Sequence, residues 1–390
     1  MATIALGRSF RPPNIPTLMR RMWIAALVLL ATGLAGGGAS AGASATWVVT
    51  GGGFGHGVGL SAYGAYGYGL HGTGYRQILH HYFQGIRIAE MRKAPLVRVL
   101  LTTSSGDVSF SRATKACRTR LDPSRTYTAH PRGSSVRLLS SSGKLIARCG
   151  DRLHADSPRM IRIDGVGVYR GALEALPTGS GSMNLVNALN VNNYARGSVP
   201  AEVPPEWPMA TLRTFAVAAR SIALSTDVGG DGYDLYPDTR TQNYGGVAVE
   251  DARTDRAVQS TGNQVATYGG DVIQTTYFSA SGGRTESGFL GAPDVPYLQS
   301  VSDPYDYYSP LHHWTFRFSQ ADMNARLGPY VSGALRGIRV TKRGDSPRID
   351  YAQLIGTGGT STIRGDTLAA ALGLYDRWAF FKKVGRPSRR

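Results

Sequence analysis

The alternation of apolar and polar positions divides the chain into a strand-rich stretch and a more helical second half. From Leu96 to about Ala175, short apolar and β-branched runs alternate with Ser, Gly and Arg turns, which is typical of antiparallel strands. The expected strands are residues 96–101, 126–129, 136–139, 145–148, 160–163 and 168–176, and a turn or linker is expected at 177–182.

The second half carries helical periodicity. Apolar residues recur at i, i+3, i+4 and i+7 from Met209 to about Thr226, and this predicts an amphipathic helix whose first turn suits Pro208. Gly269-Gly270 is a hairpin signal. Further helices are expected at 75–83, 251–261 and 365–374, and further strands at 265–267, 272–278, 338–341 and 349–354. The pattern indicates an α+β fold, with an antiparallel β-rich module and a helix-containing core.

The stretch from Gly51 to Tyr75 follows neither pattern, because eleven of its twenty-five residues are glycine. The tyrosines among them argue against a plain Gly/Ser linker and favour a surface that another segment approaches closely. His56 stands between two glycines. It is a candidate hydrogen-bond donor to a ligand, with a polar loop residue as the alternative.

The N-terminus has the order of a secretory signal. Four arginines precede the apolar run Trp23–Ala35, and Ala43-Ser44-Ala45 supplies a small-residue cleavage site. The run is short for a spanning helix, which needs about 20 residues; an uncleaved anchor at residues 23–35 is the alternative. We therefore expect export to the cell envelope or the exterior, with membrane contact only through this segment.

The net charge of +17 falls to +13 without the first 45 residues, which hold four arginines and no acid. An exported basic chain suits an anionic envelope polymer, and nucleic acid is not expected as a partner. Cys117 and Cys149 have no clustered histidines, so a disulfide is favoured over a zinc site. No cofactor and no metal are expected.

Glu202 is the acid that the residues alone single out. It lies between Pro200 and Pro204-Pro205, with Trp207 close behind, so the segment has few conformations. A carboxylate held near aromatic and apolar groups has its pKa raised by desolvation, as a general acid requires. The alternative is a solvated acid in a Pro-rich loop. Glu206 is a rival acid, although the helix dipole explains an acid at a helix start.

Other polar groups are weaker candidates. Asp303 and Asp306 stand among tyrosines and suit a cation or a sugar, but such a run is more often a turn. Ser279 and Ser281 lack the Gly-x-Ser-x-Gly elbow of a serine hydrolase. His80-His81 are adjacent on a predicted helix, so they cannot easily share a metal.

From Val168 onward the chain resembles the SpoIID/LytB family of bacterial cell-wall proteins. The matching pieces are VYRGALEAL (168–176), LVNALNVNNYARGSVPAEVPPEWPMATLRTFAVAARSIAL (185–224), TQNYGG (241–246), AVQSTGNQVATY (257–268), YFSASGGRTES (277–287), PYLQSVSDPYD (296–306) and RGDTLAAALGL (364–374). The tract GFGHGVGLSAYGAYG is similar to the family's glycine-histidine motif, which ends the domain in many members and precedes it here. The expected division is 1–45 signal or anchor, 46–95 Gly-rich segment, 96–167 β-rich module, 168–380 catalytic core and 381–390 basic tail.

The resemblance implies glycan cleavage, because the sporulation member of the family is a lytic transglycosylase of peptidoglycan. Its catalytic glutamate falls in the VPAE piece, at Glu202. The LytB branch implies an alternative, a non-catalytic wall-binding protein or an enhancer of a cell-wall amidase. We expect the Gly-rich tract to pack against the half that contains Glu202, with His56 near one end of the glycan groove. Other candidate groove residues are Arg213, Gln242, Tyr244, Ser279, Ser281 and Thr285.

The chain departs from the family pattern near the proposed acid. Family members commonly have Lys and Gln where this chain has Arg213 and Phe215, and an acid where it has Asn193. Arg keeps the positive charge but not the geometry of Lys. Zinc, seen in some relatives, has no evident ligands here.

Overall fold

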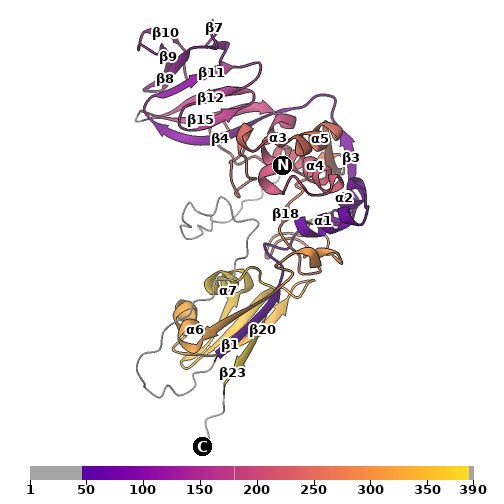
Figure 1. Cartoon of the computed structure of the whole chain (residues 1–390). Helices are drawn as coiled ribbons and strands as arrows, with labels where there is room; N and C mark the ends of the chain where they lie inside the picture. Colours follow the sequence, from indigo (N-terminus) through magenta and orange to yellow (C-terminus); the bar gives the residue numbers. More distant parts are fainter. Residues whose placement is uncertain (1–45, 180, 386–390) are drawn as a thin grey trace, which may run out of the picture. The chain divides into compact units, whose positions relative to one another are not determined.

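The buried side chains form three hydrophobic clusters, one in a β-sandwich, one among central helices and one in a C-terminal α/β module. This computed structural model describes residues 46–179 and 181–385 (Figure 1). Helices and antiparallel strands are mixed along the chain, so the α+β class is confirmed. The expected signal and the anchor at 23–35 lie outside the described residues. Within them, no helix is both long and apolar enough to span a bilayer.

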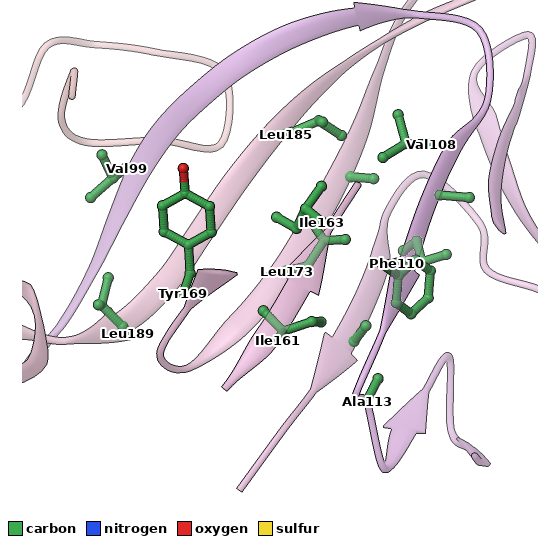
Figure 2. Close-up of a cluster of buried hydrophobic side chains, with 14 of the residues drawn as sticks. Val99, Val108, Phe110, Ala113, Ile161, Ile163, Tyr169, Leu173, Leu185 and Leu189 are labelled. Carbon is green, nitrogen blue, oxygen red and sulfur yellow. The ribbon is translucent and has the colours of Figure 1, made fainter. Parts of the chain in front are cut away.

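Two six-stranded antiparallel sheets form the sandwich, and each contributes alternate apolar residues to one core. Figure 2 shows Leu173 and Leu185 of one sheet near Val108 and Phe110 of the other. One sheet has the order β4 (Leu96–Ser105), β15 (Ser182–Asn190), β14 (Ala172–Gly179), β11 (Leu153–Asp156), β6 (Lys115–Ala116) and β7 (Thr119–Arg120). The other has the order β10 (Leu145–Arg148), β9 (Ser135–Ser140), β8 (Thr126–Arg132), β5 (Val108–Ser111), β12 (Ile161–Ile163) and β13 (Gly167–Tyr169).

A disulfide joins the two sheets near their edges. Cys117 lies in the β6–β7 turn and Cys149 directly follows β10, with 5.2 Å between their Cα atoms. The predicted disulfide is therefore confirmed.

The sandwich continues beyond residue 168. The run expected as one strand at 168–176 is broken after Tyr169, and its second part, β14, pairs with β15 as a hairpin. The residues expected as a turn or linker at 177–182 thus include the ends of both hairpin strands. Because β15 also pairs with β4, the sandwich extends to Asn190 and leads directly into the next helix.

The central region packs helices around one buried helix, α4. Its apolar stripe is buried as expected, but Thr211, Thr214 and Ser221 on other faces are buried too. Their hydroxyls donate to backbone carbonyls, so their burial leaves no polar atom unpaired. The helices are α1 (Ala62–Leu70), α2 (Tyr75–Tyr82), α3 (Val191–Glu202), α4 (Met209–Ser225) and α5 (Ala252–Ser260). The strands are β2 (Leu60–Ser61), β3 (Arg87–Glu90), β16 (Gln264–Tyr268), β17 (Asp271–Val272) and β18 (Tyr277–Phe278), with the 3-10 turns η2 (Gly246–Val249) and η3 (Asp306–Tyr308).

The Gly-rich tract is part of this region. Its strand β2 pairs in parallel with β18, and α1 continues directly from β2. A Cβ at Gly64 would overlap the Tyr82 hydroxyl and the Asp303 carboxylate, so a larger residue would separate α1 from its neighbours. The prediction that this tract packs against the half containing Glu202 is confirmed, because β18 and α4 both belong to that half.

The C-terminal module begins with the first described strand. β1 (Thr46–Gly52) lies between β19 (His313–Ser319) and β23 (Ala379–Val384), and pairs antiparallel with both. Lys382 and Lys383, expected in the basic tail, belong to this strand, and both side chains are exposed. The remaining elements are α6 (Gln320–Leu327), η4 (Gly328–Tyr330), β20 (Leu335–Arg343), β21 (Ile349–Gly356), β22 (Gly359–Arg364) and α7 (Gly365–Leu372).

Candidate active site

Glu202 is the last residue of α3, not part of a Pro-rich loop as the sequence suggested. The Asn190 side chain caps the start of this helix by accepting from the Asn193 N–H, at 2.9 Å. After Glu202 the backbone turns extended at Val203, and the prolines that follow cannot continue the helix. The sequence therefore places Glu202 at the negative end of a helix dipole, where a carboxylate is disfavoured.

The segment after Glu202 is fixed by contacts on both sides. Arg253 of α5 donates to the carbonyls of Pro205, at 2.9 Å, and Trp207, at 3.0 Å. The Trp207 ring packs against Tyr63 and Tyr66 of α1, with centroid distances of 5.3 and 4.8 Å. These half-buried tyrosines extend an aromatic surface from the end of α3 along α1. Aromatic faces of this kind suit the apolar faces of sugar rings.

Two hydrogen bonds hold the Glu202 carboxylate. The Asn243 N–H donates to Oε1 at 2.6 Å, and the Tyr277 hydroxyl also bonds the carboxylate. Desolvation by burial nevertheless raises the pKa of Glu202 above its usual value, against the lowering effect of these bonds. A fraction of Glu202 can thus hold a proton at pH values where an exposed glutamate is ionised.

Tyr277 links Glu202 to the buried helix α4. Its hydroxyl donates to Gln242 Oε1 at 3.1 Å, so its one hydrogen is divided between Gln242 and Glu202, and Gln242 Nε2 donates to the Ala219 carbonyl at 3.1 Å. The Phe215 ring meets the Tyr277 ring edge-on, at 5.1 Å between centroids. Burial and the neighbouring Glu202 raise the pKa of Tyr277 well above its ordinary value, so it remains a neutral donor. Phe215 thus supports the ring that bonds the acid.

His56 contacts the backbone of the same tyrosine. Its Nδ1 accepts from the Val58 N–H at 3.1 Å, which leaves Nε2 as the protonated nitrogen that donates to the Tyr277 carbonyl at 3.0 Å. Burial lowers the pKa of His56 to about 4, so the ring is neutral at neutral pH. Both ring nitrogens have protein partners here, which places His56 behind Tyr277.

Asp303 and Asp306 lie in a buried polar network. Asp303 accepts from the Tyr82 hydroxyl at 2.8 Å and from Ser281 Oγ at 2.7 Å. Asp306 accepts from Ser61 Oγ and from the Ser281 N–H, at 3.0 and 2.7 Å. Burial, and then the neighbouring Asp306, raise the pKa of Asp303 to about 7. The network fastens the Gly-rich tract to the loop after β18.

The other candidate groove residues lie in varied surroundings. Arg213 donates to Ser260 Oγ on α5, at 2.9 Å. The Tyr244 ring stacks on buried aromatic side chains and its hydroxyl donates to Asn187, while the Thr285 hydroxyl accepts from the Val301 N–H. The half-buried Ser279 accepts the Tyr63 N–H through its carbonyl, at 3.0 Å, and so adjoins the aromatic surface.

The described residues contain no cluster of side chains that could ligate a metal ion. Over 46–179 and 181–385, no three His, Cys, Asp or Glu side chains lie together as metal ligands, and both cysteines are bonded to each other. The donor set therefore does not fit a structural zinc ion.

Sequence reasoning missed two residues that contact Glu202. Tyr277 stands at the start of the quoted run YFSASGGRTES, and Asn243 lies between two candidates that were chosen, Gln242 and Tyr244. Asn243 contacts Glu202 through its backbone N–H. Every residue except proline has this group, so the residue type could not reveal the contact. Tyr277 carried a weak signal, a hydroxyl-bearing aromatic beside a strand end.

Part of the chain is similar to known proteins. Residues 179–268, which include Glu202, match the family described as Stage II sporulation protein, SpoIID. An uncharacterised protein of Brachyspira hyodysenteriae is 34% identical over 42% of this chain and 45% of its own length. Stage II sporulation protein D of Bacillus subtilis is 26% identical over 51% of this chain and 62% of its own length.

An amidase enhancer of Bacillus subtilis is 33% identical over 34% of this chain, but over only 18% of its own length. In each of these comparisons the match spans less than two thirds of the relative. The resemblance first seen in the motifs is confirmed: residues 179–268 match the SpoIID family, and the similar proteins include a Stage II sporulation protein D and an amidase enhancer.

Proposed function

We propose that this chain is an exported lytic transglycosylase that cleaves the bond between N-acetylmuramic acid and N-acetylglucosamine in peptidoglycan. Its similarity to Stage II sporulation protein D and to an amidase enhancer supports a cell-wall-related function. The observation that carries the finer proposal is the state of Glu202, a mostly buried acid with a raised pKa beside an aromatic surface.

One carboxyl group is enough for this chemistry. Protonated Glu202 donates its proton to the glycosidic oxygen as the bond from C1 of N-acetylmuramic acid breaks. The resulting carboxylate takes the proton of the C6 hydroxyl of the same sugar, whose oxygen attacks C1 and closes a 1,6-anhydro ring. No water is consumed, so the carboxylate pair of a glycoside hydrolase is not required.

Tyr277 and the Asn243 N–H act both when Glu202 donates its proton and when the carboxylate takes one back. Their hydrogen bonds hold the carboxyl group in one orientation and stabilise the carboxylate that forms when the proton has left. Gln242, Phe215 and His56 act through Tyr277 and are positioning residues.

The test is product analysis by mass spectrometry. The protein is incubated with purified glycan strands, with and without stem peptides. We expect anhydro-ended fragments from at least one substrate, and we expect Glu202→Gln to abolish them. If neither substrate gives new ends although binding is retained, the proposal is wrong.

The second candidate is a non-catalytic enhancer of a cell-wall amidase. It is favoured by the match to an amidase enhancer and by Arg213, whose guanidinium bonds Ser260 and not Glu202. Adding the protein to an N-acetylmuramoyl-L-alanine amidase and intact walls distinguishes the two. Faster amide cleavage that is equal with Glu202→Gln supports the enhancer.

A further inference from the structure

The positive charge of this chain is gathered in the β-sandwich. Residues 96–190 hold fourteen Lys and Arg against six Asp and Glu, whereas residues 191–385 hold eighteen against nineteen. The proposed glycan chemistry uses none of this charge. The sandwich therefore carries a property that the site around Glu202 does not explain.

Part of this charge surrounds one cavity. The cavity measures about 470 Å³, which is within the ordinary range for ligand sites. It is formed where the β6–β7 turn, the end of β10 and β11 meet, and Figure 1 shows β7 and β10 at the same end of the sandwich. Its lining residues include the cations Lys115, Arg118, Arg148 and Arg152, together with His154 and Asp156.

Three of the four cations are not neutralised. Arg152 pairs with the buried Glu174 at 3.3 Å, and His154 lies between Glu174 and Asp156. Among the described residues no carboxylate is within ion-pair distance of the three remaining cations, Lys115, Arg118 and Arg148, and all three are exposed. Like charges collected in one concave surface repel each other and favour an anion between them.

The backbone turn that carries one of these cations is strained. Cys117 and Arg118 form the two-residue turn between β6 and β7, and their φ angles are 48° and 67°. Turns of this type normally use Asn or Gly, because a side chain in the left-handed region costs about 1 kcal/mol or more. The disulfide from Cys117 to Cys149 ties the turn to the end of β10, and both cysteines line the cavity.

We propose that this cavity binds the phosphates of a phosphodiester polymer, in which polyol or sugar units are joined by anionic phosphate groups. Arginine forks match phosphate oxygens in a bidentate geometry, and three uncompensated cations suit a chain that brings several negative charges together. A phosphodiester stays ionised at every envelope pH, so the site holds its ligand without a proton. The site lies in the sandwich and is independent of Glu202.

The test is a titration of the full-length protein with an oligomer of glycerol phosphate. Isothermal calorimetry measures the binding at low and at high salt. We expect saturable binding with one site, weakened by salt. Arg118→Gln and Arg148→Gln should each lower affinity by about tenfold or more, as charge-assisted hydrogen bonds are lost. Arg118→Lys should recover part of the loss.

Arg336→Gln is the matched control, because Arg336 is an exposed arginine of the C-terminal module and its loss changes the net charge equally. It should leave affinity unchanged. If Arg336→Gln weakens binding as much as Arg118→Gln, attraction is only a matter of net charge and the site is disproved. If polyglutamate of equal charge competes as well as the phosphate oligomer, the assignment to phosphate is wrong. Unchanged thermal unfolding shows that each variant is folded.

Discussion

The sandwich and the region around Glu202 differ in their balance of charge. The sandwich concentrates uncompensated cations around a cavity, whereas residues 191–385 carry nearly equal numbers of both signs. A general acid needs this balance, because cations placed close to Glu202 would stabilise its ionised form and lower its pKa. If both proposals hold, the sandwich attracts an anionic polymer and the region around Glu202 keeps a proton, so the two tasks belong to different parts of one chain. The following experiments test how far that separation holds.

The largest expected effect is on glycan cleavage. Glu202→Gln keeps the shape of the side chain and removes the acid, so the rate of anhydro-product formation should fall by about a thousandfold. Glu206→Gln, at the exposed acid four residues later, is the control and should keep full activity. Cleavage that survives Glu202→Gln would break the assignment of chemistry to this region.

The next effect is on the stability of the sandwich. Replacing both Cys117 and Cys149 by Ala removes a link between residues 32 positions apart, and should lower the free energy of unfolding by about 3 kcal/mol. The measurement is urea unfolding followed by circular dichroism. Cleavage by the folded fraction should be unchanged, and a proportional loss of activity would show that the two regions are coupled.

A smaller effect is expected at Tyr277. Tyr277→Phe removes a hydrogen bond that favours the charged form of Glu202, so the pKa of the acid should rise further. Activity that needs protonated Glu202 should then persist to higher pH, while the rate at the optimum falls by about tenfold. Tyr244→Phe removes a buried hydroxyl that bonds Asn187 instead, and its pH profile should not move.

The smallest effect concerns the buried network behind the site. The pKa of Asp303 is raised from the ordinary aspartate value of 3.8 to about 7, so between these pH values the folded chain holds a proton that the unfolded chain has lost. This contribution to stability is complete at low pH and disappears as pH rises through about 7. Asp303→Asn should flatten the decline of melting temperature over this window. A decline of equal slope in the variant would exclude Asp303 as its source.

Much of the local structure could be predicted because its causes are local. The period of α4, the hairpin at Gly269-Gly270 and the short helix α2 follow from residue spacing and turn chemistry. Glu202 could be predicted as a candidate from its prolines, and in the fold it is a mostly buried acid with a raised pKa. Its helical position could not, because Pro200 suggested a loop and the helix accommodates it in the last turn.

The missed features depend on contacts between distant segments. Tyr277 matters because β2 brings His56 behind it and α4 brings Phe215 against its ring, and none of these is near it in sequence. The basic cavity escaped notice for the same reason. Arg148 is thirty residues after Arg118 in the other sheet, and it meets Lys115 and Arg118 only when the two sheets pack.

The position of β1 has a consequence for how the chain is made. Residues 46–52 form the middle strand of a sheet whose outer strands are residues 313–319 and 379–384. A chain that emerges from its N-terminus therefore presents an apolar strand with two free edges long before either partner exists. Such a strand is a template for wrong pairing until synthesis is nearly complete. The C-terminal module closes late, and a premature stop before Ala379 would leave one edge of β1 open for the lifetime of the protein.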